Sequence, residues 1–105
     1  MDNSTELKAL RIFEPDPATV YNIEITERLT QIPRRTIAVY VRHHLVAPVV
    51  EQGEGMFFDE EAIRVLRQIE QLRRSYGVNL PGIKMIMRLL EELEQRQSEL
   101  RFRRG

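Results

Sequence analysis

Two short helical stretches separated by three residues limit the fold of this chain more than any other feature. Residues 22–30 (NIEITERLT) predict a helix that begins after Asn22, a residue type whose side chain caps helix starts well. A break at residues 31–33 (QIP) follows, and residues 34–44 (RRTIAVYVRHH) predict a second helix with apolar residues on one face. The run VYV would also suit a strand. Two short helices joined this closely form the skeleton of a helix-turn-helix.

A small β-hairpin is predicted directly after the helix pair. Residues 45–50 (LVAPVV) read as a strand interrupted by Pro48, GEGM reads as a turn, and MFF returns as a second strand. A hairpin in this position corresponds to a wing. We therefore expect a winged helix-turn-helix domain over residues 19–77, preceded by an N-terminal arm over residues 1–18.

The helix that follows the hairpin has clear start and stop signals. Asp59 is the expected N-cap, with Glu60 and Glu61 in the first turn, where acidic residues complement the helix dipole. Gly77 is suited to end the helix because it adopts the left-handed conformation without strain. The fold class expected from these elements is mostly α.

The last segment, residues 78–105, carries the apolar seam of a short coiled coil. Asn79 is its expected N-cap. The seam residues follow a and d heptad spacing and are Ile83, Ile86, Leu90, Leu93 and Leu100. A seam this short is marginal alone, so we predict that residues 78–105 form a dimerisation helix that packs against a second copy of the chain.

Charge is distributed unevenly, although the formal net charge is zero. Residues 28–50 contain no acidic residue and carry four arginines, whereas residues 51–62 (EQGEGMFFDEEA) contain five acidic residues. Over the whole chain, residues 1–62 hold six Lys/Arg and eleven Asp/Glu, whereas residues 63–105 hold ten and five. This asymmetry between the two parts favours a partner surface over a substrate pocket. A basic segment followed by an acidic hairpin therefore raises the question of which charge faces the partner.

Several classes of function are disfavoured by composition. The chain has no cysteine, which excludes disulfides and thiolate metal sites. Adjacent His43 and His44 are poorly spaced as ligands on one helix, so we expect no metal site. We find no set of a nucleophile, a base and an orienting group, so we also expect no enzymatic activity and no cofactor. The start of the chain lacks a signal-peptide pattern, and no apolar run is long enough to cross a membrane. These features favour a soluble cytoplasmic protein that does not engage a membrane.

Residues 21–48 (YNIEITERLTQIPRRTIAVYVRHHLVAP) resemble the MerR-type winged helix-turn-helix. The matching positions are Tyr21, Ile23, Leu29, Thr30, Arg35, Thr36, Ile37, Tyr40, Leu45 and Pro48. Residues 77–86 (GVNLPGIKMI) resemble the same region of the HspR heat-shock repressors and of CbpM, a modulator of a DnaJ-type co-chaperone. The likeness covers about residues 20–100. It implies a winged helix-turn-helix with a small β wing and a coiled-coil-like last helix.

The departures from the MerR pattern concern residues that would face DNA. MerR-type DNA binders usually carry arginines in the wing before an aromatic residue that enters the core. Here that aromatic is Phe58, and Met56 and Phe57 precede it. Ala38 stands where an arginine is usual, and Gln31 stands where glycine is common. CbpM-type proteins have an arginine-free wing of this kind.

The leading interpretation is a CbpM-like chaperone modulator. By this resemblance it would bind the basic helix of the J-domain of a DnaJ/CbpA-type co-chaperone and inhibit its action with DnaK. The residues expected to bind this partner are Glu51, Glu54, Phe57, Asp59, Glu60 and Glu61. Helix capping alone would also explain the last three of these residues.

The alternative interpretation is a DNA-binding transcriptional regulator of the MerR or HspR type. A dimer would place two copies of residues 34–44 in successive major grooves. Arg34, Arg35 and Arg42 would then contact phosphates. A scaffold that acts only through its coiled-coil end is a third, weaker possibility.

Overall fold

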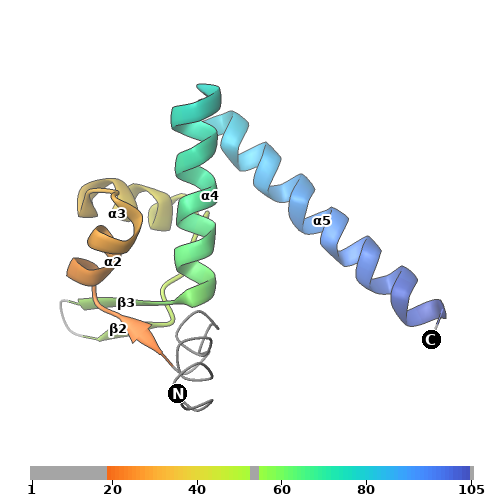
Figure 1. Ribbon diagram of the computed structural model, residues 1–105, viewed down its shortest axis with the longest axis horizontal. Coiled ribbons are helices and arrows are strands. Elements are labelled where there is room, and N and C mark those ends of the chain that lie inside the picture. Colours follow the sequence, from red (N-terminus) through yellow and green to blue (C-terminus); the bar gives the residue numbers. More distant parts are fainter. Residues whose placement is uncertain (1–18, 53–54, 105) are drawn as a thin grey trace, which may run out of the picture.

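The computed structural model describes residues 19–52 and 55–104 and shows a mostly helical chain with a small sheet (Figure 1). The elements are β1 (Val20–Tyr21), α2 (Ile23–Thr30), α3 (Arg34–Arg42), β2 (Val50–Gln52), β3 (Gly55–Asp59), α4 (Glu60–Tyr76) and α5 (Leu80–Arg104). The predicted N-terminal arm, residues 1–18, lies outside the described residues. The predicted mostly α winged helix-turn-helix is confirmed.

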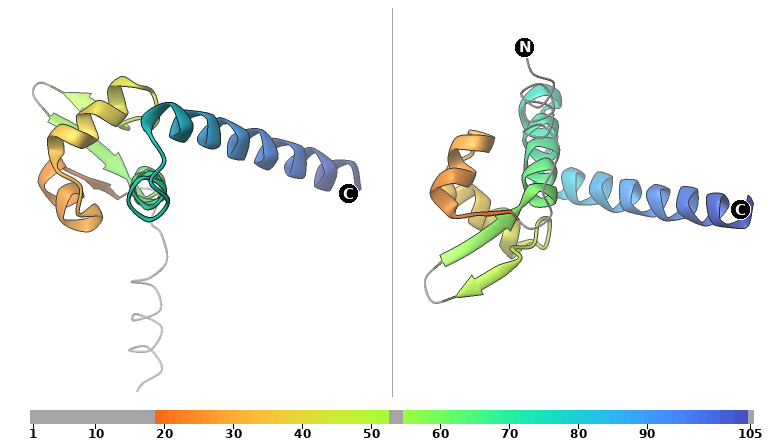
Figure 2. Two further views of the ribbon diagram at one scale, coloured as in Figure 1. Left: turned by 90° about the horizontal axis from the view of Figure 1, so that it is seen from above. Right: turned by 60° about the horizontal axis from the view of Figure 1, so that its bottom comes forward.

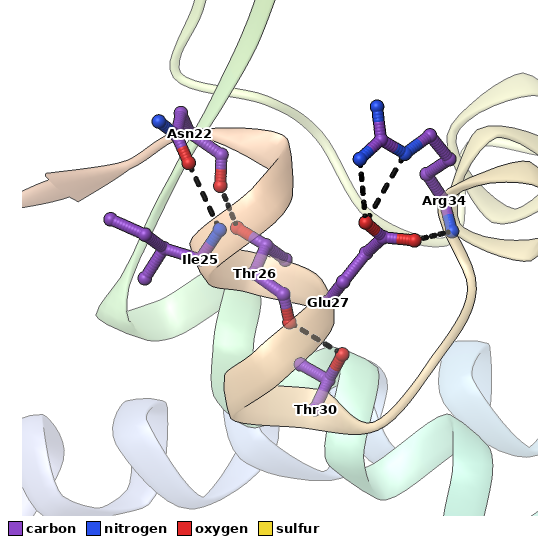
Figure 3. Close-up of polar contacts among 6 residues, drawn as sticks. All are labelled: Asn22, Ile25, Thr26, Glu27, Thr30 and Arg34. Carbon is purple, nitrogen blue, oxygen red and sulfur yellow. Dashed lines mark hydrogen bonds and ion pairs between the residues drawn. The ribbon is translucent and has the colours of Figure 1, made fainter.

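Helix α2 begins and ends as the sequence predicts. The Asn22 side chain accepts a hydrogen bond from the backbone N–H of Ile25 at 2.9 Å, which caps the first turn. The buried Thr26 and Thr30 hydroxyls donate to backbone carbonyls four residues earlier, at 2.8 and 2.7 Å. Gln31 ends the helix in the left-handed region, with φ of 60°. Figure 3 shows these contacts of α2.

Helix α3 is shorter than predicted. It ends at Arg42, not at residue 44. The backbone N–H of Leu45 donates to the Tyr40 carbonyl at 3.0 Å and closes a turn after the helix. His44 takes a positive φ of 60° in this turn. The run VYV is helical, because Tyr40 is buried against the core from a helical position.

The sheet has three strands, in the order β1-β3-β2. In the wing, Val50 pairs with Phe57 and Gln52 with Gly55, and β1 adds two residues to the other edge of β3. The predicted strand over residues 45–50 is wrong except for its last residue. Val46, at 6% exposure, is buried in the core as part of an irregular loop, whereas Val49 is 45% exposed, so only part of the apolar run packs in the core.

Helix α4 is the axis on which the other elements pack. The Asp59 side chain accepts from the backbone N–H of Ala62 at 2.8 Å, and Gly77 ends the helix with φ of 64°. Its inner face packs with side chains from α3, β3, the start of α5 and the connecting loops in one core. The core residues are Ile32, Ile37, Tyr40, Val46, Phe58, Ala62, Leu66, Ile69 and Ile83.

Helix α5 leaves the end of α4 at an angle and extends away from the rest of the molecule (Figures 1 and 2). Asn79 caps it by accepting from the backbone N–H of Gly82 at 3.0 Å. Ile83 is only 1% exposed within the core of its own chain, which corrects its predicted place in the dimer seam. The available seam starts at Ile86 and Leu90, which are half-buried. Of its later residues, Leu93 and Leu100 are exposed.

Within the described ranges, no helix combines the length and apolar character that crossing a bilayer requires. The longest, α5, is instead interrupted by charged residues throughout its second half.

Candidate nucleic-acid interface

The outward face of α3 presents two free arginines. Arg35 and Arg42 are seven residues apart, which is about two helical turns, so they project from the same side of the helix, opposite its buried face. Both are exposed, and among the described residues neither makes a hydrogen bond or ion pair through its side chain. Ala38 lies between them and is partly exposed. This face can contact a polyanion without first breaking an internal contact.

The third predicted phosphate ligand, Arg34, is placed differently. Its guanidinium Nη2 and Nε donate to the Glu27 carboxylate at 2.9 and 3.1 Å, and its backbone N–H donates to the other oxygen of that carboxylate at 2.7 Å (Figure 3). These hydrogen bonds, from the side chain first and then the backbone, lower the pKa of Glu27. The same contact raises the pKa of Arg34 above its ordinary value. The structure therefore does not group Arg34 with Arg35 and Arg42.

A buried carboxylate ties α3 to α4. Glu70 is 7% exposed and accepts a hydrogen bond from the Tyr40 hydroxyl at 3.1 Å. It also accepts from Arg73 at 2.5 Å and from Arg74 at 2.7 Å. Burial acts to raise the pKa of Glu70, but the bonds and charge of Arg73, with the bonds from Tyr40 and Arg74, outweigh it and lower that pKa. Because α3 is held through its buried side, its outward face stays exposed.

A second tie joins α2 to α4. The Arg67 guanidinium donates to the Leu29 carbonyl, with Nη2 at 2.9 Å and Nε at 3.3 Å. Leu29 lies in the last turn of α2, where backbone carbonyls lack partners within the helix. Sequence reasoning missed the contacts of Glu27 with Arg34, of Arg67 with Leu29 and of Glu70 with Tyr40, because the two residues of each contact lie in different elements. The pairs of Glu70 with Arg73 and Arg74 are local to α4, at i+3 and i+4, and that spacing could have indicated them.

The acidic residues at the start of α4 are engaged within the chain. Asp59 caps the helix, Glu60 accepts a hydrogen bond from the Tyr21 hydroxyl, and Glu61 pairs with Arg64 at 2.5 Å. The Arg64 hydrogen bond is the main cause of a lowered pKa of Glu61. These contacts agree with a capping and pairing role for the three carboxylates.

The remaining members of the predicted acidic surface lie in the wing. Phe57 is half-buried on β3, and the backbone of Glu51 in β2 pairs with that of Met56 in β3. Glu54 falls outside the described residues. Phe58 is fully buried, as predicted for the aromatic that enters the core, and the residues of β3 include no arginine.

Metal coordination has no visible basis in residues 19–52 and 55–104, where no three histidine, aspartate or glutamate side chains gather closely enough to hold an ion. His43 and His44 lie in the turn after α3, and both are exposed.

The arrangement of two short helices, a wing and a long last helix matches a known family over most of the chain. The family described as MerR HTH family regulatory protein matches residues 22–104. The chain belongs to the MerR family. The matched range of this MerR-family protein includes α2, α3, the wing, α4 and α5, so it covers both the basic face of α3 and the last helix.

Two kinds of curated relative resemble this MerR-family chain. It is 37% identical to a heat shock protein named HspR from Streptomyces coelicolor over 84 residues. These residues make up 77% of this chain and 56% of the relative. It is 32% identical over 74 residues to the HTH-type transcriptional regulator GlnR of Bacillus anthracis and of Bacillus cereus, which is 70% of this chain and 57% of each relative. The chain thus spans little more than half the length of these relatives. None of the names describes an enzyme.

The predicted MerR-type family and the likeness to HspR are confirmed by these matches. The more specific likeness to CbpM stays a prediction.

Proposed function

We propose that this MerR-family chain is a cytoplasmic, DNA-binding transcriptional regulator that inserts α3 into the major groove. The observation that carries the proposal is the outward face of α3, where Arg35 and Arg42 are exposed and unpaired within the described chain. The description of the GlnR relatives as HTH-type transcriptional regulators supports it. DNA-binding regulation is the alternative interpretation of the sequence, and the family match and the GlnR relatives favour it over the chaperone modulator.

The geometry of α3 suits contact with the DNA backbone. Arg35 and Arg42 are separated by about 10 Å along the helix axis, so they can reach phosphates on either side of the groove that α3 enters. Ala38 between them leaves room for close approach of the helix to base edges. Arginine in this setting both neutralises phosphate and donates to it in a fixed fork.

A dimer through α5 would supply the second half of the interface. Leu89, Leu93 and Leu100 are 55%, 52% and 57% exposed on a helix that extends away from the core. Covering these side chains with a second copy would remove apolar surface from water. It would also present two α3 helices to major grooves one helical turn apart, roughly 34 Å.

The test is to select a bound sequence from a random duplex library and to measure its affinity by fluorescence anisotropy over a range of salt. We expect Arg35→Ala to weaken binding and to reduce the slope of log K against log salt by about one. Arg88→Ala is the matched control, because Arg88 is exposed on α5 and lies on the side away from the leucine seam. If the Arg35 and Arg88 variants bind alike, α3 does not contact phosphate through Arg35.

A second candidate function rests on the arginine-free wing. Met56 and Phe57 occupy the positions before Phe58, so β3 offers DNA no guanidinium. We propose as the second candidate that the wing and the start of α4 bind the J-domain of a DnaJ/CbpA-type co-chaperone and inhibit its work with DnaK. Calorimetric titration with that J-domain at two salt concentrations would test this: binding that weakens with salt would favour it. Unchanged binding by a variant with both Glu51 and Glu54 changed to lysine would refute the acidic wing as the docking site.

A further inference from the structure

The first turn of α3 is capped by a carboxylate from the preceding helix. Pro33 occupies the N-cap position and makes no side-chain capping bond. Glu27 of α2 reaches across instead, with one carboxylate oxygen on the Arg34 backbone N–H and the other on its guanidinium (Figure 3). One carboxylate therefore accepts three hydrogen bonds from a single residue at the start of the helix that we propose to enter DNA.

This contact uses the same donors that a DNA phosphate would need. A guanidinium donates through a planar fork, and a phosphate and a carboxylate accept from that fork in the same way. The Nε and Nη2 groups of Arg34 are both directed at Glu27. Arg34 can thus bind a phosphate through this fork only if it first leaves Glu27, and its charge is neutralised while it stays.

The other two arginines of α3 have no such competitor in the described chain. They border a groove on the side of α3 that faces Leu80 and Ile83, whereas Arg34 lines a shallow polar hollow between α2 and α3. Residues 28–50 contain no acidic residue, so the acids nearest to Arg34 along the chain are Glu27 and Glu24 of α2. Glu27 is the α2 acid that makes this contact.

We propose that Glu27 withholds Arg34 from DNA, so that Arg35 and Arg42 supply the phosphate contacts of α3. Glu27 is a positioning residue in this scheme: it fixes the first turn of α3 against α2 and limits how many phosphates the helix neutralises. The inference rests on the DNA binding proposed above.

The experiment compares two variants that remove the same charge from the same helix. Glu27→Gln keeps an oxygen that can accept from the backbone but weakens the hold on the guanidinium. Glu24→Gln is the matched control, because Glu24 is exposed one turn earlier in the same hollow and its side chain acts on Arg34 through charge, without a hydrogen bond or ion pair in the described chain. The probe is a fluorescein-labelled 24-base-pair duplex of mixed sequence, and affinity is measured by anisotropy from about 50 to 200 mM salt.

Freeing Arg34 should add about one phosphate contact. We expect the salt slope of Glu27→Gln to steepen by about 0.9, so that its advantage over wild type grows about threefold between the highest and lowest salt. Glu24→Gln should leave the slope unchanged. Arg34→Ala should cost wild type little affinity but should abolish the gain in the Glu27→Gln background.

Three outcomes would overturn or separate the claims. Equal salt slopes for Glu27→Gln and Glu24→Gln would mean that only the loss of a negative charge from α2 matters. That result would overturn the inference about Glu27 but not the DNA-binding proposal. Arg34→Ala weakening wild type as much as Arg35→Ala does would also overturn it, and this result does not depend on the stability of the Glu27 variant. Folded wild type that binds no duplex at any salt would overturn the DNA-binding proposal together with the inference.

Discussion

Replacing Tyr40 by phenylalanine removes one hydroxyl and isolates the tie between α3 and α4. Tyr40 is 3% exposed, and its hydroxyl donates to Glu70 at 3.1 Å. The ring and its packing are retained, so the change leaves no large cavity. Glu70 loses one of three donors but keeps Arg73 and Arg74.

The expected loss follows from the kind of hydrogen bond removed. A hydrogen bond to a charged group contributes roughly 1.5–3 kcal/mol to stability. The two remaining guanidinium partners of Glu70 place the loss at the lower end, about 1.5 kcal/mol. For a domain of this size that lowers the Tm by about 6–12 °C.

Thermal unfolding followed by circular dichroism measures this loss, and urea denaturation at 25 °C gives the change in the free energy of unfolding. Tyr76→Phe is the matched control, because it removes the same atom from a ring that is 70% exposed at the end of α4. A Tm for Tyr40→Phe within about 2 °C of that of Tyr76→Phe would refute a stabilising tie between the two helices.

Three further changes test separate features of the fold. Folding lowers the pKa of Glu70, so the stability that this carboxylate contributes is present above its unfolded pKa and is lost as the pH falls through its folded pKa. In urea titrations from pH 7 to 3, the free energy of unfolding should therefore fall more steeply below about pH 4.5 in wild type than in Glu70→Gln. Gln31→Gly should raise the Tm by a few degrees, about 0.5 kcal/mol, since glycine adopts the φ of 60° without strain, and a lower Tm in calorimetry would count against this. Leu93→Glu should leave the circular dichroism spectrum unchanged but shift sedimentation from dimer to monomer, and a wild type that is already monomeric at micromolar concentration would rule out the α5 seam.

Helix boundaries could be predicted where the stabilising contact is local. Asn22 and Asp59 each accept from a backbone N–H three residues ahead, and Gly77 ends α4 through its own backbone conformation. Such contacts depend on residue type and spacing alone, because no other element needs to be in place. The start of α4 and its acidic first turn were therefore predicted correctly.

The prediction failed or was silent where the partner lies in another helix or strand. Glu27 to Arg34 spans seven residues across a turn, and Tyr40 to Glu70 spans thirty. Ile83 has a heptad spacing that suits a dimer seam, but the direction in which α5 leaves α4 places it in the core. No periodicity in one segment encodes the position of another, so these roles needed the tertiary structure.

The charge of a segment does not by itself predict the charge that a partner meets, because the fold pairs some charged side chains internally and leaves others exposed. Asp59 caps α4, Glu60 accepts a hydrogen bond and Glu61 forms an ion pair. Arg35 and Arg42, in contrast, make no side-chain hydrogen bond or ion pair within the described chain. The fold thus preserves the basic surface of α3 and diminishes the acidic surface at the start of α4. The proposed recognition of a basic protein partner would therefore depend mainly on the other two predicted acidic residues, Glu51 and Glu54. The double reversal of those two residues to lysine therefore separates the two candidate functions sharply: it should abolish binding of a J-domain, but it should strengthen binding of a DNA duplex by adding positive charge beside the phosphates.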